Sequence, residues 1–429
     1  MLLNSIKRQL RNSWVPWVTA IVLTCLGNAA AQASYKVTDL GVLPNHNLGC
    51  AMGLNNRGWT EIMEGTLAPG TENSASGVLL NGRAAIDIDG INFDLGTLGG
   101  KNSWTNYGGI NEQGEAVGYA ETDVPDPNGE DVCLFGTGLT CRPFLWRNGS
   151  MRALPRLGGN NGQASAINKH GQISGYAENG IVDSTCPTGV RNNLIDLPVL
   201  WEKGEARPLA TVGSDPDGVA FGINDQGQAA GYSGTCTSAN HAVRWEKNGT
   251  ATALDDFGVP GASEGFGIND HGEIIGIAFS AEGALYAAIW QGKAITSLNT
   301  LPGDVNSIGE GINNRGQAVG STQDSAGNWS HAFLWQNNAM IDINTLFPAS
   351  SNLYATMANE INDRGQISGM AVVLSGPHAG EVHAFVATPV NASIDRSIAD
   401  VASTFPKPSL PANVGKQILR RFGVGQFGR

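Results

Sequence analysis

The segment GINNRGQAVGS, residues 311–321, carries the motif that decides the fold of this chain. Its core is an apolar residue followed by Asn-x-x-Gly, which occurs seven times, in AMGLNNRG, YGGINEQG, ASAINKHG, AFGINDQG, GFGINDHG, GEGINNRG and ANEINDRG. The repeated asparagines lie at spacings of 56, 57, 56, 45, 44 and 49 residues and are Asn55, Asn111, Asn168, Asn224, Asn269, Asn313 and Asn362. Seven copies at this period are typical of a β-propeller, because a leucine-rich solenoid repeats over a much shorter length.

Each copy has the pattern of four short strands. The apolar residue ends the first strand, and Asn-x-x-Gly forms a tight hairpin in which asparagine accepts hydrogen bonds and glycine takes a left-handed conformation. A second strand such as QAAGY (228–232) follows, then a third such as HAFLW (331–335) and a fourth such as MIDINTL (340–346). One such sheet cannot bury both of its faces alone, so the copies must pack together. We therefore predict an all-β fold over residues 34–389, a seven-bladed propeller of four-stranded antiparallel blades.

The two ends of the repeat region complement each other. The seventh copy stops at its third strand, VHAFVATP (382–389), and has no fourth. At the other end, YKVTDLGVL (35–43) matches a fourth strand such as FDLGTLGG (93–100). We therefore expect the N-terminal strand of the mature protein to complete the last blade and to close the ring, which removes the open edges.

Four segments together resemble the repeat of the HAF-repeat, or extracellular-repeat, proteins of bacteria. They are HAFLW at 331–335, GINNRGQAVGS at 311–321, GINDQGQAAGY at 222–232 and FDLGTLGG at 93–100. The resemblance spans about residues 35–389. It implies export and a propeller-like architecture, but no activity, because the family is defined by its repeat. The first copy departs from the pattern, since WTEIMEG (59–65) lacks the glycine of the second strand and GVLLNG (77–82) lacks tryptophan.

The first 33 residues have the regions of a secretory signal peptide. Lys7, Arg8 and Arg11 precede an apolar stretch at 14–26, and Ala31-Gln32-Ala33 is a small-residue cleavage site. This predicts a mature protein that starts at Ser34 and is secreted into the periplasm or the extracellular space; the alternative is an uncleaved membrane anchor. No other stretch is apolar enough to span a bilayer, so we do not expect an integral membrane protein.

The charge balance restricts the partners. Without the leader, 23 Lys and Arg remain against 38 Asp and Glu, a net charge of −15. Such a protein has no electrostatic reason to bind nucleic acid. The tail at 390–429 differs: from residue 401 on it holds five cations and no acid. The tail is therefore a segment that either contacts an anionic envelope surface or the acidic ring, or is disordered. We expect a monomer.

Five cysteines remain once the leader is removed. In an oxidising compartment some of them would form disulfides. Cys133 and Cys141 bracket one glycine-containing connection. Cys186 and Cys236 occupy corresponding connections of adjacent blades. We therefore predict the disulfides Cys133–Cys141 and Cys186–Cys236, with Cys50 left free.

The connections at one end of the blades vary in length and content, whereas the hairpins at the other end are short and repetitive. Variable loops on a rigid scaffold are where recognition usually occurs, so we place the candidate binding surface at this variable face. Its aromatic, amide and acidic side chains suit a protein or carbohydrate ligand, although polar loop residues without a ligand would look the same. The candidates are Trp104, Tyr107, Asn160, Asn161, Asp217, Glu264, Asp304, Asn306 and Tyr354.

Asp87, Asp89, Asn92 and Asp94 are a weak candidate for Ca²⁺, with an ordinary strand end as the alternative; otherwise we expect no cofactor and no metal. The chain has no G-x-S-x-G, H-E-x-x-H or C-x-x-C motif. We therefore favour a non-catalytic binding or interaction module. The alternatives are a structural adhesin, and a propeller hydrolase or lyase acting on polysaccharide, which would need paired carboxylates or a His/Asp pair at a channel mouth.

Overall fold

The structure, a computed structural model, describes residues 35–67, 79–187, 194–259 and 263–390. Within these ranges the chain forms strands β1 to β28 and one short 3-10 helix, η1 (Ile343–Leu346). No helix in the described part is long and apolar enough to cross a membrane. The predicted signal peptide, its cleavage site at Ser34 and the basic tail from residue 391 lie outside the described residues.

The predicted all-β fold of four-stranded antiparallel sheets is confirmed. Five sheets are separate meanders in chain order. The first is β6 (Gly99–Ile110), β7 (Ala116–Pro125), β8 (Leu139–Arg147) and β9 (Ser150–Ala153). The second is β10 (Gly162–Ile167), β11 (Ile173–Val182), β12 (Leu194–Glu202) and β13 (Glu205–Pro208). The third is β14 (Asp217–Ile223), β15 (Ala229–Thr235), β16 (Ser238–Trp245) and β17 (Ala251–Ala253). The fourth is β18 (Ser263–Ile268), β19 (Ile274–Phe279), β20 (Leu285–Gln291) and β21 (Ala294–Asn299). The fifth is β22 (Asp304–Ile312), β23 (Ala318–Asp324), β24 (Trp329–Gln336) and β25 (Ala339–Asp342).

The remaining eight strands form one larger sheet with two parts. One part is β2 (Leu48–Leu54), β3 (Thr60–Leu67), β4 (Leu79–Ile88) and β5 (Ile91–Asp94). The other is β26 (Leu353–Ile361), β27 (Ile367–Val373), β28 (Val382–Pro389) and β1 (Tyr35–Gly41). A single parallel pair, Leu48 with Val382, joins the parts. Each part alone therefore has the four-stranded form of the other sheets.

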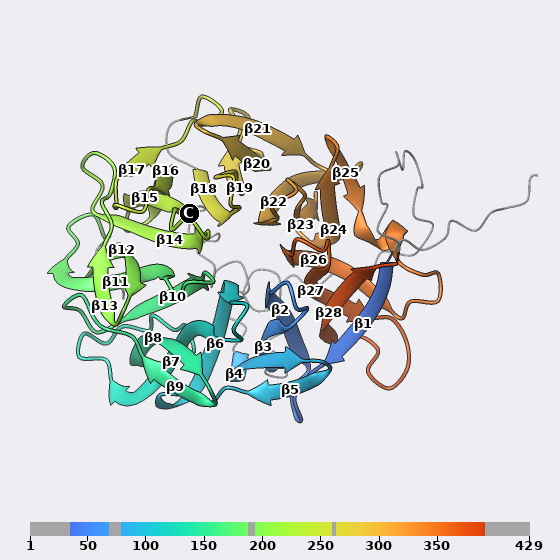
Figure 1. Ribbon diagram of the computed structural model, residues 1–429, viewed down its shortest axis with the longest axis horizontal. Coiled ribbons are helices and arrows are strands. Elements are labelled where there is room, and N and C mark those ends of the chain that lie inside the picture. The colour runs from blue at the N-terminus through green and yellow to red at the C-terminus, as the bar shows by residue number, and fades with distance from the viewer. Residues whose placement is uncertain (1–34, 68–78, 188–193, 260–262, 391–429) are drawn as a thin grey trace, which may run out of the picture. The chain divides into compact units, whose positions relative to one another are not determined.

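The N-terminal strand lies where the sequence predicts it. β1 pairs antiparallel with β28, from Tyr35 opposite Pro389 to Gly41 opposite Ala384, and Figure 1 shows the blue β1 beside the red β28. Asp39 of β1 also lies 2.9 Å from Nδ1 of His383. That hydrogen bond raises the pKa of His383 and so favours its charged form. The first and last described strands are thus joined by backbone and side-chain contacts.

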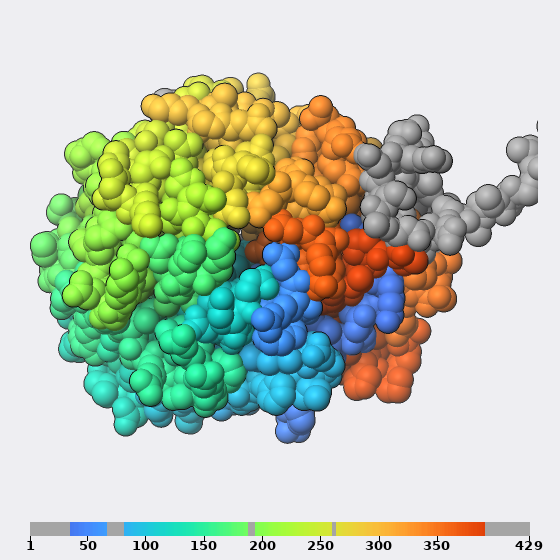
Figure 2. All heavy atoms as spheres, viewed as in Figure 1, coloured from blue at the N-terminus to red at the C-terminus, as the bar shows by residue number. Residues whose placement is uncertain are grey.

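The sheets follow one another around a centre (Figure 1). Each innermost strand contacts the innermost strand of the next sheet, from β2 through β6, β10, β14, β18, β22 and β26, and β26 contacts β2 again. On the face shown in Figure 2, the side chains of neighbouring sheets pack against each other all the way round. This contact circle buries both faces of the sheets, as the repeat pattern requires.

The tryptophans at the ends of third strands pack between sheets. Trp201, Trp245 and Trp290 are all 2% exposed or less. Their indole N–H groups donate to the backbone carbonyls of Pro155, Ala210 and Asp255 at 2.9, 2.6 and 2.8 Å. Each of these carbonyls lies in the connection that leads into the tryptophan's own sheet. Because each indole is both buried and hydrogen-bonded, its role is packing rather than ligand contact.

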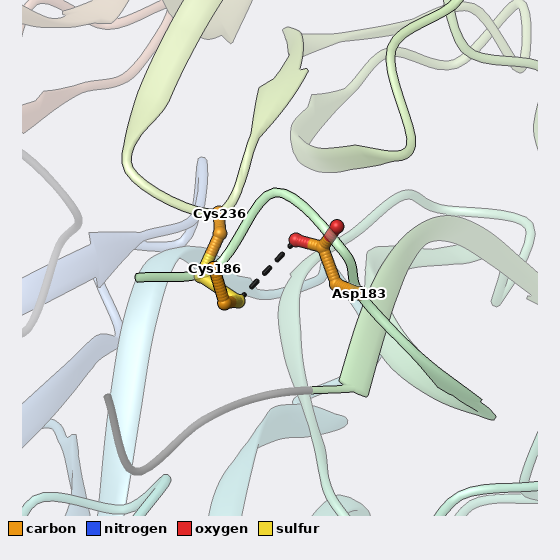
Figure 3. Close-up of side chains that lie close together, drawn as sticks. All are labelled: Asp183, Cys186 and Cys236. Atoms are coloured by element: carbon orange, nitrogen blue, oxygen red, sulfur yellow. Dashed lines mark hydrogen bonds between the residues drawn. A yellow bond between two sulfur atoms is a disulfide. The ribbon is translucent and has the colours of Figure 1, made fainter. Parts of the chain in front are cut away.

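Both predicted disulfides are present. Cys133 bonds to Cys141 with 5.3 Å between Cα atoms, and Cys186 bonds to Cys236 with 5.0 Å. The second bridge ties the second-to-third-strand connections of adjacent sheets, beside the carboxylate of Asp183 (Figure 3). Cys50 is the free cysteine of the described region and is buried in β2. Two disulfides are typical of proteins from an oxidising compartment.

The Asn-x-x-Gly hairpins are built as the sequence predicts. In the fifth four-stranded sheet, Asn313 Oδ1 accepts from the backbone N–H groups of Arg315 and Gln317, both at 3.0 Å. Gly316 N–H donates to the Asn313 carbonyl at 3.0 Å and has φ of 70°, a conformation that favours glycine. The same bonds occur at the other six asparagines, so their role as turn formers is confirmed.

The asparagine side chains also form a closed circle of hydrogen bonds, which the sequence did not predict. Each Nδ2 donates to the backbone carbonyl of the asparagine in the next repeat, at 2.9 to 3.3 Å, and Asn362 donates back to Asn55. All seven asparagines are 5% exposed or less. We refer to this set as the asparagine ring. It links every repeat to its neighbour without a break.

Replacing one member of the asparagine ring is expected to be costly. Asn313→Ala removes the bond to the Asn362 carbonyl and two acceptor bonds within the turn. At about 1 kcal/mol per buried hydrogen bond, the free energy of unfolding should fall by about 3 kcal/mol. The matched control is Asn248→Ala, an exposed turn asparagine that accepts only from Thr250 N–H and should cost well under half as much. Urea unfolding of both variants measures the difference, and equal losses would contradict a structural role for the ring.

Candidate functional site

A cavity of about 470 Å³ lies at the hairpin end of the central channel. It is lined by three consecutive residues from each repeat: the apolar residue before the repeated asparagine, the asparagine itself and the residue after it. We call it the hairpin-face cavity. Because the three positions follow one another along each inner strand and turn, they form three levels from the interior outward.

The innermost level is an aliphatic floor. Its side chains are largely buried and consist of Leu54, Ile110, Ile167, Ile223, Ile268, Ile312 and Ile361. Above it lies the asparagine ring, whose amide groups are already used in the turns and between repeats. The floor therefore offers apolar contact, and the ring offers a rigid support with few free donors.

The outermost level is a polar rim with its own hydrogen bonds between repeats. It consists of Asn56, Glu112, Lys169, Asp225, Asp270, Asn314 and Asp363. In six of the seven steps around the rim, a side-chain oxygen accepts the backbone N–H of the preceding repeat, as Asp270 does from Asp225 at 2.9 Å. The step from Glu112 to Lys169 lacks this bond, because an ammonium group cannot accept one. These bonds hold the rim carboxylates in place.

The rim carries a negative charge. Four of its residues are acids, and its one cation, Lys169, lies 2.9 Å from Asp225. Both remaining partners of Asp363 are the neutral amides of Asn314 and Asn56, at 3.0 and 3.4 Å. The seven rim residues thus have a net charge of −3, while Arg57, Arg315 and Arg364 occupy the next position in three of the same hairpins. Such a surface favours a cationic ligand.

Aromatic side chains cross the channel deeper inside. Tyr107 of β6 stacks on Phe266 of β18 with ring centroids 6.1 Å apart, and Phe266 contacts Phe221 at 5.3 Å. These belong to one buried cluster together with Cys50 and Met357 of other inner strands. Side chains from opposite parts of the circle therefore meet at its middle, and the hairpin-face cavity ends above them.

Four glutamates are buried near this cluster: Glu61, Glu264, Glu310 and Glu360. Burial raises the pKa of Glu264, Glu310 and Glu360 to about 8 and that of Glu61 well above its ordinary value. Neither carboxyl oxygen of Glu61 or Glu264 has a hydrogen-bond partner among the described residues. Since an unpaired buried charge is very costly, these carboxyl groups are protonated at neutral pH.

The predicted variable-face residues do not form an open surface together. Six of the nine are buried, at 5% exposure or less: Trp104, Tyr107, Asn161, Asp217, Glu264 and Tyr354. Asn160, Asp304 and Asn306 are half-buried as whole residues, but the side chain of Asp304 is only 1% exposed. Tyr107 lies in the channel cluster, and Trp104 belongs to the same cluster through Phe135. Ligand binding at these residues stays a prediction, and it would need the buried side chains to become accessible.

Three of these residues instead connect neighbouring sheets. Asn161 Oδ1 accepts Cys141 N–H, Asp217 Oδ1 accepts Asp196 N–H, and Asn306 Oδ1 accepts Leu285 N–H, all within 2.8 to 3.0 Å. In each case the acceptor lies within two residues of the start of an inner strand, and the donor belongs to the third strand of the preceding sheet. Each of the three stands at the same place ahead of the repeated asparagine of its own repeat. This regular position in the sequence indicates a structural role.

Ser330, His331 and Asp304 have the residue types of a nucleophilic triad but not its geometry. Ser330 Oγ lies 3.0 Å and Asp304 Oδ2 2.8 Å from the same ring nitrogen of His331, Nδ1. A triad needs the hydroxyl and the carboxylate on opposite nitrogens of the imidazole. Ser330 also donates to Asp304 directly. The group is therefore a buried hydrogen-bond cluster.

The weak Ca²⁺ candidates have other partners. Asp87 accepts Gly90 N–H across the β4–β5 turn, and Asp94 lies 3.2 Å from Arg83. Among the described residues, three or more His, Cys, Asp or Glu ligand atoms come within 4.8 Å of one another in two places only: Asp183 with Cys186 and Cys236, and His378 with Glu381 and His383. The first includes the disulfide of Figure 3. Asp87, Asp89 and Asp94 are in neither group.

The hairpin-face cavity was not predicted from the sequence. The repeated asparagines and the apolar residues before them were predicted to have structural roles only. The signal that could have indicated the cavity is the residue after each asparagine, which is acidic in four of seven repeats. Four acids at one end of a ring are notable only once the ring is known to bring those positions together.

Comparison with known proteins assigns neither a family nor an activity to this chain. No protein family matches the sequence, and no curated protein is similar to it. Among solved structures, virginiamycin B lyase from Staphylococcus aureus aligns with 83% of this chain and all of its own, at 11% identity and a TM-score of 0.47. The β-propeller domain of the Trilobed protease from Pyrococcus furiosus aligns with 70% of this chain and 84% of its own, at 12% identity and a TM-score of 0.42. A gluconolactonase from Xanthomonas campestris aligns with 84% and 91%, at 9% identity and a TM-score of 0.37. At such identities no activity transfers to this chain.

Proposed function

We propose that the protein is an exported, seven-bladed β-propeller of the HAF-repeat kind that binds a cationic segment of another protein in its hairpin-face cavity. The seven-membered asparagine ring and the pairing of β1 with β28 support the blade count and the closure. The two disulfides support export to the periplasm or beyond. The observation that carries the binding proposal is a cavity of about 470 Å³ with an aliphatic floor beneath a rim of four acids.

The two levels of the cavity define the ligand. A lysine or arginine side chain, or the amino terminus of a peptide, combines a positive charge with an apolar stem. The charge would lie at the rim beside Asp270 and Asp363, and the stem would contact the aliphatic floor. A neutral sugar would gain little from the rim charge, and an anion would be repelled. The ligand is therefore a basic peptide segment rather than a polysaccharide or nucleic acid.

The alternative of a propeller enzyme rests on one observation. Glu264 and Glu310 have pKa values raised by burial to about 8, the range in which a carboxyl group acts as a general acid. A general acid must also contact its substrate, and both side chains are 1% exposed. We therefore propose a non-catalytic role for the cavity. If the cavity binds no soluble ligand, the remaining alternative is a structural adhesin.

A charge-neutralising variant tests the proposal. In Asp270→Asn/Asp363→Asn, each new amide oxygen can still accept the backbone N–H that the carboxylate accepts, from Asp225 and Asn314 respectively. Binding of a fluorescein-labelled tetralysine peptide, measured by fluorescence anisotropy, should be about tenfold weaker in this variant, and weaker in the native protein at high salt.

Two further proteins make the test specific. Lys169→Gln removes the only rim cation and should bind the peptide more tightly. Glu205→Gln removes an exposed acid on the outer strand β13 and should leave binding unchanged. If native protein does not bind the peptide, or if all three variants bind it equally, the cavity is not a site for cations.

A further inference from the structure

A second group of side chains, separate from the hairpin-face cavity, has the composition and spacing of a metal site. His378, Glu381 and His383 lie at the opposite end of the strands, where the connection from β27 to β28 reaches the third strand of the last sheet. His378 Nδ1 is 3.1 Å and His383 Nε2 is 3.2 Å from the same oxygen, Glu381 Oε2. All three ligand atoms are within 4.8 Å of one another.

The backbone holds these three residues in place. Glu381 immediately precedes β28 and His383 is the second residue of that strand, so at a spacing of two residues in extended chain their side chains point to the same side. Glu381 N–H donates to the His378 carbonyl at 3.0 Å and closes a turn that returns His378 toward them. The Glu381 carbonyl in turn accepts Val373 N–H at 3.0 Å, which fixes the turn to the end of β27. The group is therefore positioned by hydrogen bonds and not by side-chain contacts alone.

A fourth residue has the position of an outer partner. Asp39 of β1 is 2.9 Å from Nδ1 of His383, the nitrogen that faces away from Glu381. A carboxylate on the distant nitrogen of a ligating histidine fixes the tautomer and the orientation of its ring. Asp39 and His383 are separated by 344 residues, so this arrangement exists only because β1 completes the last sheet.

The group is specific to one repeat. Histidine occupies the same third-strand position in two other sheets, as His241 and His331. Two residues before them stand Ala239 and Trp329, where His383 has Glu381. A scaffold role would be served equally by all three histidines, whereas a site needs features that the other repeats lack.

We propose that His378, Glu381 and His383 bind one Zn²⁺ ion, with Asp39 as the residue that positions His383. Around a tetrahedral Zn²⁺ with ligand bonds near 2.0–2.1 Å, neighbouring ligand atoms are about 3.3 Å apart, close to the 3.1 and 3.2 Å found here. Two imidazoles and one carboxylate suit Zn²⁺ better than Ca²⁺ or Mg²⁺, which prefer oxygen ligands. His378 is 62% exposed, so the fourth position is accessible to solvent.

The test uses the mature, disulfide-bonded protein without a polyhistidine tag. Isothermal titration of the EDTA-treated protein with Zn²⁺ should show one ion per chain, and Co²⁺ should give the visible absorption of a tetrahedral site. His378→Ala and Glu381→Gln should each weaken Zn²⁺ binding at least a hundredfold. Asp39→Asn should keep the stoichiometry and weaken binding about tenfold, as loss of an outer partner does.

The control is His271→Ala, which removes an exposed histidine from a hairpin on the other end of the strands. It should bind one Zn²⁺ as the native protein does. Unfolding midpoints in EDTA should agree between native protein and His378→Ala, which shows that the variant folds. Absence of stoichiometric Zn²⁺ binding, or binding that survives in both His378→Ala and Glu381→Gln, would overturn the proposal without affecting that of the hairpin-face cavity.

Discussion

The protein is expected to lose stability steadily as the pH rises from 5 to 9. Burial raises the pKa of Glu264, Glu310 and Glu360 to about 8, whereas a glutamate in the unfolded chain has a pKa near 4.3. Between these two values the folded state binds more protons than the unfolded state. The free energy of unfolding is therefore highest below the unfolded pKa and falls as the pH rises through the folded pKa. For one such group, a shift of this size corresponds to on the order of 3–5 kcal/mol.

Other shifted groups do not reverse this trend. Hydrogen bonds to His331 and Thr322 outweigh burial and lower the pKa of Asp304, so its contribution is lost only as the pH falls below about 4. The hydrogen bond to Asp39 raises the pKa of His383, so its contribution is lost as the pH rises, in the same direction as that of the glutamates. Between pH 5 and 9, the change in the free energy of unfolding is thus dominated by groups that make the folded state more stable at the lower pH.

Glu264→Gln isolates one of these groups. The amide resembles the protonated acid in shape and cannot ionise, so the variant should match the native protein at pH 5 and be more stable by several kcal/mol at pH 9. Glu205→Gln, an exposed acid, is the control and should follow the native curve. Urea unfolding at both pH values measures the differences. A native protein whose stability is constant or rises from pH 5 to 9 would show that the buried carboxyls are not protonated.

The second large effect is expected when β1 is removed. A chain that starts at Asn45 lacks the strand that pairs with β28, along with the contact between Asp39 and His383. Tyr35, which is 1% exposed and packs in the cluster of the last sheet, would be lost as well. One buried aromatic side chain is worth about 2 kcal/mol, and the strand hydrogen bonds add to it, so the loss should reach several kcal/mol.

The loss should also spread and expose an edge. Each sheet leans on its neighbours, so opening the last one weakens those beside it, and unpaired β28 is a template for aggregation. The comparison is thermal unfolding and light scattering of chains that start at Ser34 and at Asn45. The single substitution Lys36→Ala, on an exposed side chain of β1, is the control and should unfold as the longer chain does. Equal melting temperatures for the two chain lengths would mean that the circle does not depend on β1.

Local rules were enough to predict much of this molecule. The bonds of Asn313 to Arg315 and Gln317 span two and four residues, so turn chemistry alone predicts them. The missing fourth strand after 389 and the extra strand at 35–43 predicted the pairing of β1 with β28, because strand patterns can be counted along the chain. The same positional reasoning placed Cys186 beside Cys236.

Tertiary structure decided which positions meet and which are buried. The asparagine side chain is long enough to fill its own turn and also to reach a carbonyl that is 44 to 57 residues away in six repeats and 307 residues away in the seventh. Only the packing of neighbouring sheets brings that carbonyl within reach. Asn161 and Asp217 look like polar loop residues in the sequence, but a backbone N–H of the preceding sheet lies opposite each of them. Glu264 follows the same logic: its burial and raised pKa come from side chains on strands far along the chain. Spacing along the sequence predicts the contacts that a residue makes with residues a few positions away. The closure of the circle determines which distant residues surround it.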